Sequence, residues 1–347
     1  MNHAAEVYCQ FDPLQEVWLG DCYPEEFYAE LTPDIRSAFS KITEITRREL
    51  TILEQRLQSL GIIVHRPLFT NDVDNYKDNA GNLLKPPITP RDDNMVLGKT
   101  FYSLRHQYPK NPWQHVLDQY SANGIIVHEA QFLEKYGYLK PPSIVRLGKE
   151  ILIDIDSHSH SWELIERDIF PEWQEQFRII ACHTGGHSDS VFCIPQPGII
   201  ITSHWKHDYH EFPGWEVYKL PKQKQPNLDG ENNQAWWIDN CDLSHPGFNH
   251  HIQTRALDWV GNAKETIFEV NSLMVNESLI ITTGEPDKKT KEWLAVKGID
   301  YIPMEFSARH FWDGGIHCLT VDTKRQGVQR DFFPERDQNI YYFSESL

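Results

Sequence analysis

A cysteine in a glycine-rich setting is the first residue that could do chemistry. Cys318 lies in the string Gly314-Gly315-Ile316-His317-Cys318-Leu319-Thr320. The two glycines would let the backbone approach a ligand closely, which suits an exposed nucleophile. The alternative is a buried structural thiol, because free cysteine is among the most buried residue types. A nucleophilic cysteine also needs a base and an orienting carboxylate from elsewhere in the chain.

Candidates for that base and carboxylate occur in the string His187-Ser188-Asp189, which follows Gly185-Gly186 and precedes an apolar run from Val191. Alternation along a strand predicts that His187 and Asp189 lie on one side. A neutral histidine beside a carboxylate could transfer a proton to an amine. The alternative is an ordinary polar strand end.

A further acidic pair, Asp92-Asp93, follows Pro90-Arg91 just before the apolar run at Met95. On its own this is an ordinary turn into a strand. However, four candidate residues each lie at the end of an apolar hairpin strand: Asp92, His187, Asp189 and Cys318. A ring of such hairpins would therefore bring these side chains to one axis.

Pairs of short apolar runs separated by a turn recur along the whole chain. They are residues 95–97 with 101–102, 144–147 with 151–153, 191–194 with 199–201, and 273–275 with 279–281. The runs 17–19 near the start and 317–320 near the end complete the series. Their spacing of roughly 50 to 70 residues predicts a propeller-like array of about five hairpin-plus-helix units. We expect these units to form a single domain over residues 1–347.

The elements between the hairpins are also visible in the sequence. Apolar residues recur at three- and four-residue steps over residues 34–60, which predicts an amphipathic helix that ends at Gly61. The string Gly-Ile-Ile-Val-His occurs at 61–65 and again at 124–128, and predicts a short strand each time. Residues 221–251 interrupt the rhythm with Lys, Gln, Pro, Asn and Gly, and are expected to form a long loop over one face.

The composition excludes several classes of partner. The chain has 347 residues, with 33 Lys and Arg against 50 Asp and Glu and a net charge of −17, which argues against binding to nucleic acid or to an anionic membrane. No apolar run approaches the roughly 18 residues of a membrane span, and the first residues lack a signal-peptide pattern, so we expect a cytoplasmic protein. The six cysteines, with no CxxC, are expected to be free thiols.

A metal site is an alternative use of the histidines. Residues His204, His207 and His210 form an HxxHxxH run, and further histidines stand at 245, 250 and 251. Three-residue spacing is not the usual zinc arrangement, and no cysteine or carboxylate partner is evident. Exposed loop histidines are the favoured interpretation, so no metal is expected.

Taken together, the strings resemble those of the guanidino-modifying (pentein) superfamily, which includes amidinotransferases, arginine deiminases and dimethylarginine hydrolases. The resemblance is strongest to glycine and inosamine-phosphate amidinotransferases. The matching strings are residues 11–20, 90–92, 187–189 with 197–200, and 314–322 with Arg325 and Gly327. The cysteine and histidine motifs are specific to the superfamily. They do not separate transferases from hydrolases.

The resemblance implies an α/β fold, a five-bladed pseudo-symmetric α/β propeller built from repeated hairpin-plus-helix units. It implies that Cys318 is the nucleophile and that His187 protonates the departing amine. Asp92 and Asp189 would clamp a planar guanidinium cation. Lys206 would anchor the carboxylate of the substrate. No cofactor is implied, and a homodimer is allowed.

At one place the chain departs from the resemblance. The amidinotransferases carry an aspartate near a strand that resembles residues 143–149, and Ser143 stands at the matching place. Asp93, Asp154 or Asp156 could substitute for the missing carboxylate. Without such a substitute, a guanidinium would be held less firmly.

The function implied is transfer of an amidino group from arginine, or a related guanidine, to an amine acceptor through a covalent amidino-cysteine. The alternatives are a guanidine hydrolase of the arginine deiminase or dihydrolase type, and a non-catalytic guanidine-binding relative. Retention of both Cys318 and His187 argues against the last. The acceptor amine cannot be identified, because the positions around Lys264 and Glu265 do not match the family.

Overall fold

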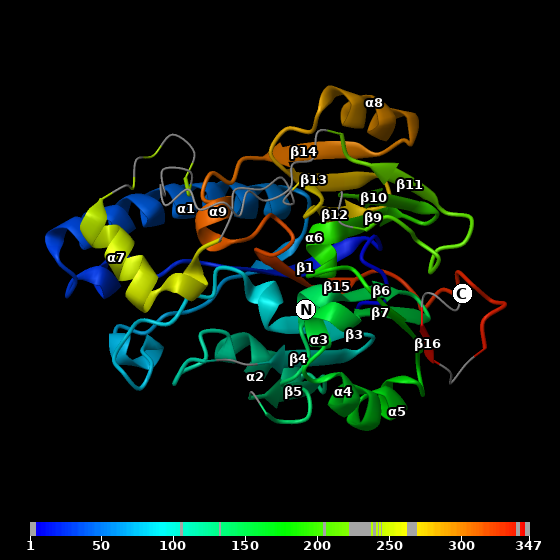
Figure 1. Cartoon of the computed structure of the whole chain (residues 1–347), viewed down its shortest axis with the longest axis horizontal. Helices are drawn as coiled ribbons and strands as arrows, with labels where there is room; N and C mark the ends of the chain where they lie inside the picture. The colour runs from blue at the N-terminus through cyan, green and yellow to red at the C-terminus, as the bar shows by residue number, and fades with distance from the viewer. Residues whose placement is uncertain are drawn as a thin grey trace.

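Five separate small sheets that share one plan are distributed along the chain (Figure 1). The computed structural model describes residues 5–104, 107–131, 133–203, 206–221, 237–238, 241, 243, 245–261, 269–337 and 341–343. In every sheet a central strand pairs antiparallel with one neighbour and parallel with another. The antiparallel pair is the predicted hairpin in four sheets, and in the fifth it joins the two ends of the chain.

The strands of the five sheets have the following bounds. The sheet that joins the chain ends contains β1 (Leu14–Leu19), β2 (Ile63–His65) and β15 (Thr320–Arg325). The next contains β3 (Asn94–Leu97), β4 (Thr100–Leu104) and β5 (Ile126–Ala130). The third contains β6 (Ile144–Leu147), β7 (Glu150–Asp154), β8 (Arg178–Cys182) and β16 (Tyr341–Phe343). The fourth contains β9 (Phe192–Gln196), β10 (Ile199–Thr202) and β11 (Glu216–Lys219). The fifth contains β12 (Leu273–Asn276), β13 (Leu279–Thr283) and β14 (Asp300–Met304).

In four of the five sheets helices lead from the central strand to its parallel neighbour, because a parallel pairing needs a long crossover, whereas the described residues between β10 and β11 form no helix. The crossover helices are α1 (Pro33–Ser59), α2 (Gln114–Ala122), α3 (Ile155–His158), α4 (Trp162–Asp168), α5 (Phe170–Trp173) and α8 (Lys288–Val296). The other helices are α6 (Ser188–Val191), α7 (Pro246–Arg255) and α9 (Arg309–Trp312). Single 3-10 turns are η1 (Glu25–Tyr28), η2 (Val73–Tyr76), η3 (Pro90–Asp92), η4 (Pro141–Ser143) and η6 (Leu257–Trp259).

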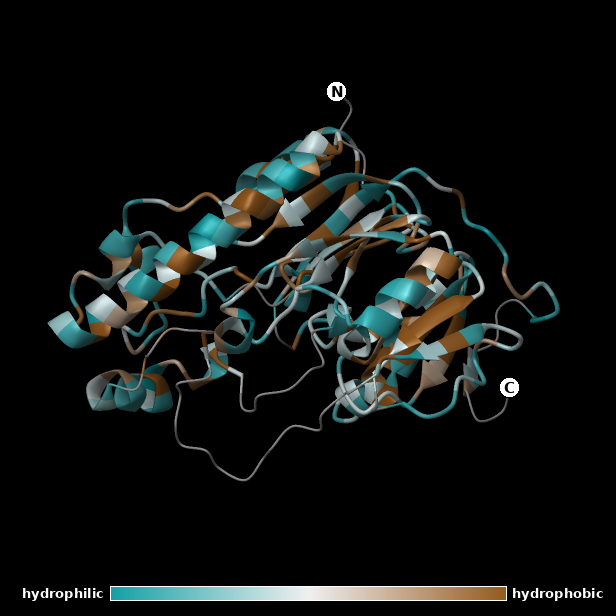
Figure 2. Cartoon of the chain, turned by 90° about the horizontal axis from the view of Figure 1, so that it is seen from above, coloured by the Kyte–Doolittle hydropathy of each residue, from teal (hydrophilic) through white to brown (hydrophobic). Residues whose placement is uncertain are grey.

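The long predicted helix is confirmed as α1. Its buried residues include Phe39, Ile42, Leu50, Leu53 and Leu57, which recur at helical spacing on one face. Hydrophobic and hydrophilic patches alternate along this helix, as expected for an element with one face on the core (Figure 2). The chain leaves the helix at Gly61, whose φ of +80° favours glycine. None of the helices formed by the described residues is both long and apolar enough to cross a membrane.

The structure confirms the predicted hairpins and corrects one local prediction. The string 187–189 is not part of a strand, because Ser190 N–H donates to the His187 carbonyl at 3.0 Å and closes a helical turn. His187 precedes α6, and β9 begins only at Phe192. The prediction that alternation places His187 and Asp189 on one side of a strand is therefore wrong. Most of the predicted excursion at 221–251 lies outside the described residues, and α7 covers its end.

Candidate active site

The residues just before the first strand of each hairpin come together. They occupy equivalent places in the five repeated units, one to three residues ahead of β3, β6, β9, β12 and β15. Sequence analysis proposed four of them as site residues; the fifth, before β12, was not predicted. The set is Asp92, Ser143, Asp189, Asn271 and Cys318.

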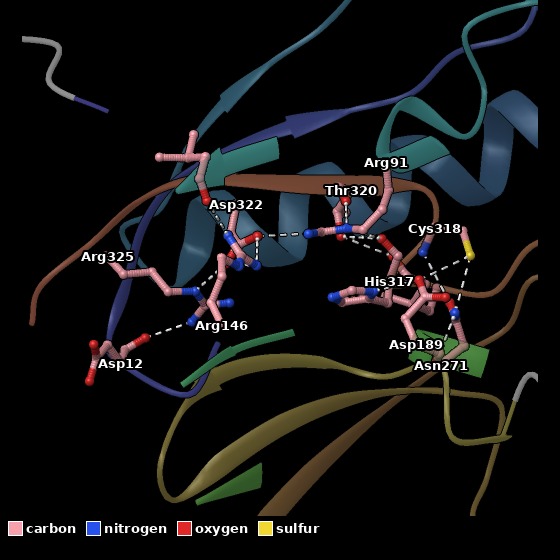
Figure 3. A network of polar contacts seen from close by, with 12 residues as sticks. Asp12, Arg91, Arg146, Asp189, Asn271, His317, Cys318, Thr320, Asp322 and Arg325 are labelled. Atoms are coloured by element: carbon pink, nitrogen blue, oxygen red, sulfur yellow. Dashed lines mark hydrogen bonds and ion pairs between the residues drawn. The ribbon is translucent and has the colours of Figure 1, made fainter. Parts of the chain in front are cut away.

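Cys318 is buried, and Asn271 and Asp189 lie beside it (Figure 3). Asn271 holds it at two points: its Oδ1 accepts the Cys318 N–H at 3.0 Å, and its Nδ2 donates to Sγ at 3.1 Å. The Cys318 Sγ also lies 3.6 Å from Asp189 Oδ2. A side chain at Gly314 would bring its Cβ to 2.9 Å from both Cys318 Cβ and Thr89 Cγ2, so only glycine fits beside the thiol.

Asp189 pairs with His317, the residue next to the cysteine. Its Oδ2 accepts a hydrogen bond from His317 Nδ1 at 2.8 Å. Its other oxygen, Oδ1, is buried and has no hydrogen-bond partner in the described structure. A buried carboxylate oxygen without a partner is costly, so a ligand that donates a hydrogen bond there would stabilise the site.

The charges around this pair set its protonation. Burial lowers the pKa of His317 to about 4, the nearby Arg91 adds to the effect, and Asp189 opposes it. Burial alone would raise the pKa of Asp189, but the hydrogen bond from His317 and the positive charge of Arg91 lower it below its usual value. At neutral pH the pair is therefore a neutral imidazole and a carboxylate. The bond to Asp189 assigns the imidazole proton to Nδ1.

The thiol of Cys318 is protonated in the free protein. Burial raises its pKa well above the ordinary value, and the negative charges of Asp189 and Asp92 raise it further. The Asn271 amide acts in the opposite direction, because it donates a hydrogen bond to Sγ. A cation placed between the two carboxylates would remove much of the electrostatic cost of forming the thiolate.

Asp92 faces the same group from η3. Thr89 Oγ1 donates to Asp92 Oδ2 at 2.7 Å, and the backbone N–H of the neighbouring Arg91 donates to the Cys318 carbonyl at 3.4 Å. Asp92 is only half-buried, which leaves it accessible to a ligand. The structure thus brings Asp92, Asp189 and Cys318 together as the sequence predicts.

His187 lies at the exposed rim of the site. It caps α6, its side chain is exposed, and its positive form would lower the pKa of Asp189. The hydrogen-bond partner of Asp189 is His317, which sequence analysis did not single out. His187 therefore stands near the reacting group without a fixed partner among the described residues.

Ser143 is fully buried, and its Oγ has no hydrogen-bond partner among the described residues. It ends η4, which packs against both η3 and α6, so it lies beside the site. Two of the proposed substitutes are used elsewhere. Asp154 accepts backbone N–H groups of Ser157 and Thr184, and Asp156 accepts that of Gly185. These bonds hold the segment that leads to His187.

Lys206 is engaged inside the protein. Its Nζ lies 2.8 Å from Glu211 Oε1 and donates to the His183 carbonyl at 3.2 Å. The side chain is buried, with Tyr209 beneath its ammonium group. To bind the carboxylate of a substrate, Lys206 would have to leave Glu211.

A second buried network lies beside the turn that carries the cysteine and is joined to it through Arg91 (Figure 3). Asp322 accepts hydrogen bonds from Arg91, Arg146 and Arg325. Arg91 also donates through Nε to the carbonyls of His317 and Thr320, at 3.2 and 2.8 Å. The turn that carries Cys318 is thus fixed to the same guanidinium that contacts Asp322.

The described residues contain no group of three or more His, Cys, Asp or Glu side chains arranged to hold a metal. In the HxxHxxH run, His207 and His210 are exposed, and His204 lies outside the described residues. Lys264 and Glu265 also lie outside them.

Comparison with known proteins finds one relative by sequence and several by structure. No protein-family model matches the chain. It is 19% identical to inosamine-phosphate amidinotransferase 1 of Streptomyces glaucescens, over 92% of this chain and 97% of that protein. The predicted resemblance to amidinotransferases is confirmed by this relative and by the solved structures.

Two solved amidinotransferases share the fold. An inosamine-phosphate amidinotransferase of Streptomyces griseus has a TM-score of 0.65 at 15% identity, covering 95% of this chain and 99% of that one. SxtG, an amidinotransferase of Microseira wollei in the saxitoxin biosynthetic pathway, has a TM-score of 0.65 at 16% identity with the same coverage. DDAH of Pseudomonas aeruginosa, solved with citrulline, has a TM-score of 0.53 at 11% identity and covers 89% of this chain and 99% of that one. The chain has the α/β fold of these enzymes, with mixed sheets.

Proposed function

We propose that this protein is an amidinotransferase, which moves the amidino group of arginine or a related guanidine to an amine acceptor through an amidino group bound to Cys318. The observation that carries the proposal is the arrangement around Asp189. This buried carboxylate contacts the thiol with one oxygen and leaves the other without a partner. In this proposal the five repeated units are the blades of a pseudo-symmetric propeller, and their equivalent ends surround the donor.

The donor would be held as a cation between two carboxylates. A guanidinium is planar and rich in N–H donors, so it can donate to Asp189 Oδ1 and to the accessible Asp92 at the same time. Both groups lie close enough to Cys318 to raise the pKa of its thiol. Bound in this way, the guanidinium carbon would lie near Sγ, and its charge would favour the thiolate.

The first half-reaction forms one bond and breaks another. The Cys318 sulfur donates an electron pair to the guanidinium carbon, and the bond from that carbon to Nε of arginine breaks. His187 takes the proton of the Cys318 thiol and passes it to the departing amine, and ornithine leaves. The amidino group stays on sulfur as a thiouronium cation, which the same two carboxylates can hold.

The second half-reaction reverses these roles. A neutral amine attacks the amidino carbon, the bond from carbon to sulfur breaks, and its electron pair returns to Cys318. His187 accepts the proton that the amine loses. If water attacks instead, the net reaction is hydrolysis, so exclusion of water decides between transfer and hydrolysis.

A guanidine hydrolase is the second candidate, because DDAH shares the fold, with the lower TM-score of 0.53. The two reactions differ in the bond that breaks. A deiminase expels ammonia and leaves the carbon chain of arginine on sulfur. A transferase expels ornithine and leaves only the amidino group.

Product analysis with arginine, with and without a panel of amines, tests the proposal. Transfer predicts ornithine and a new guanidino compound that requires the amine. Citrulline and ammonia would show hydrolysis instead. A lack of any product would favour a non-catalytic guanidine-binding protein. Cys318→Ala should remove all turnover, and Cys193→Ser, a change at a buried thiol in β9, should not.

A further inference from the structure

A cavity of about 220 Å³ adjoins the candidate active site on the side of η3. Its lining comes from the segment that leads into β3, from the end of β4, from the residues before α2 and from η6. Thr89 and Asp92 belong to this lining and also to the surroundings of Cys318. The cavity and the thiol therefore share one wall.

A second contact joins the cavity to the cysteine segment. Lys85 lines the cavity, and its Nζ donates to the Trp312 carbonyl at 3.3 Å. Trp312 lies two residues before Gly314, where an added Cβ would lie 2.9 Å from both Thr89 Cγ2 and Cys318 Cβ. A molecule in the cavity would thus lie beside the turn that carries the thiol.

Two buried amides in the lining have an unused hydrogen-bonding atom. Asn94 is 5% exposed; its Nδ2 donates to the Pro90 carbonyl, and its Oδ1 has no partner. Asn111 is 8% exposed; its Oδ1 accepts the Trp113 N–H, and its Nδ2 has no partner. Buried polar atoms are almost always satisfied, so one free acceptor and one free donor in the same lining indicate a polar ligand.

The charged side chains of the lining define the class of that ligand. Asp92, Asp93 and Asp258 contribute carboxylates, and Lys85 contributes the only ammonium group among the lining residues that the structure describes. The excess of carboxylates favours a cation. The free Nδ2 of Asn111 and the ammonium of Lys85 require, in addition, an oxygen that accepts hydrogen bonds.

We propose that this cavity is the acceptor subsite, and that it takes a hydrophilic primary amine carrying hydroxyl or carbonyl oxygens. The inference rests on the proposed function, because it assigns the second substrate of that reaction. The ammonium group binds at the carboxylates, with Asp92 nearest to Cys318, and an oxygen of the ligand accepts from Asn111. Loss of one proton from the ammonium group then gives the neutral amine that attacks the amidino carbon, and that proton leaves through His187.

Two isosteric variants test the subsite. Asp258→Asn removes one carboxylate from an exposed position, and Asn111→Asp keeps the acceptor for the Trp113 N–H while removing the free donor. The matched control is Asp300→Asn, a change at an exposed carboxylate on β14. Neither test residue contacts Cys318, Asp189 or His187 in the described structure.

The kinetic experiment separates the two substrates. The protein is treated with arginine, the Cys318 adduct is followed by intact mass, and the adduct is then chased with ethanolamine, serinol or glycine. We expect unchanged adduct formation, and a loss of about tenfold in the chase kcat/KM for Asp258→Asn, because a charge-assisted contact is lost. An equal loss in adduct formation would assign the cavity to the donor instead. An unchanged kcat/KM in the chase would show that the cavity is not the acceptor subsite.

A direct measurement of amine binding tests the subsite independently of the proposed function. Cys318→Ala cannot form an adduct, and calorimetry with ethanolamine and serinol measures its affinity for the amine alone. We expect both to bind more tightly than propylamine, which lacks the oxygen, and Asp258→Asn to weaken both by about tenfold. Equal affinity for propylamine, or no effect of Asp258→Asn, overturns the subsite even if arginine forms the adduct. If wild type forms no adduct but the amines bind as predicted, the proposed function fails and the amine site stands.

Discussion

Two buried carboxylates near the middle of this molecule have opposite surroundings (Figure 3). Both oxygens of Asp322 accept hydrogen bonds, from Arg91, Arg146 and Arg325. Asp189 uses one oxygen for His317 and the thiol, and its other oxygen has no partner in the described structure. We refer to Asp322 and its three arginines as the closed cluster, and to Asp92, Asp189, His317 and Cys318 as the open cluster.

The different surroundings of Asp322 and Asp189 indicate a structural role for the first carboxylate and a ligand-binding role for the second. Burial would raise the pKa of Asp322, but its three arginines hold it well below the usual range, so the closed cluster is electrostatically complete. In the open cluster burial raises the pKa of Cys318, and the negative charges of Asp189 and Asp92 raise it further. A buried charge without a partner is costly, so the open cluster is built for a cationic ligand.

The largest kinetic effect is expected at His187, on the exposed rim of the open cluster. His187→Asn should leave binding of arginine unchanged and slow the single-turnover rate by about 10²–10⁴, the usual loss when a general acid and base is removed. His207→Asn, a change at an exposed histidine, is the matched control. An unchanged single-turnover rate would remove His187 from the mechanism.

The two aspartates should respond in different ways to the same substitution. Asp322→Asn leaves three buried guanidinium groups without a counter-charge, so the free energy of unfolding should fall by about 3–5 kcal/mol. Asp189→Asn keeps an acceptor for His317 and removes a partly unsatisfied charge. Its stability should stay within about 1 kcal/mol of wild type, while kcat/KM for arginine falls by one to two decades, about 1.5–3 kcal/mol.

Urea unfolding measures the stability of Asp322→Asn and Asp189→Asn, and steady-state kinetics measure their kcat/KM for arginine. Equal destabilisation by the two substitutions would show that Asp189 is also part of a closed structural network. Full activity of Asp189→Asn would show that its free oxygen does not bind the donor.

The raised pKa of Cys318 predicts the pH dependence of its alkylation. Below the pKa, the thiolate fraction rises with pH, so labelling of Cys318 by iodoacetamide should accelerate about tenfold per pH unit between about pH 7 and pH 9. Peptide mapping is needed, because the half-buried Cys241 is more accessible. A labelling rate that levels off near neutral pH would contradict the protonated thiol.

Ser143→Asp should have the smallest effect. Asp154 and Asp156 are engaged by backbone N–H groups, and the Ser143 Oγ has no partner in the described structure. A carboxylate added here would add one charge-assisted contact to the guanidinium, so we expect kcat/KM for arginine to rise by about tenfold. A fall would indicate repulsion from a carboxylate that already fills this role. Kinetics identical to wild type would show that Ser143 is not in the site.

The local parts of the fold could be predicted from the sequence. Short apolar runs around turns identified the hairpins, and the three- and four-residue spacing identified α1, because both patterns depend on neighbours in the chain. The strand predicted around His187 failed because a turn of helix after Gly185-Gly186 competes with extension over so few residues.

The partners inside the site could not be predicted in the same way. Asp189 and His317 are 128 residues apart, and the choice of His317 over His187 depends on how two units pack. Asn271 could have been identified from the sequence, because it stands two residues before β12, as Asp92 stands two residues before β3. Lys206 carries a charge of the expected sign, but its pairing with Glu211 appears only in the folded chain.

The mass of Cys318 after incubation with arginine alone tests the central claim most directly. Wild-type protein is mixed with arginine, quenched in acid and digested, and the Cys318 peptide is compared with that of untreated protein. We expect a gain of one amidino group on Cys318, with release of ornithine. An unmodified Cys318, a modification at Cys182 or Cys193 instead, or an adduct that retains the carbon chain of arginine would contradict it.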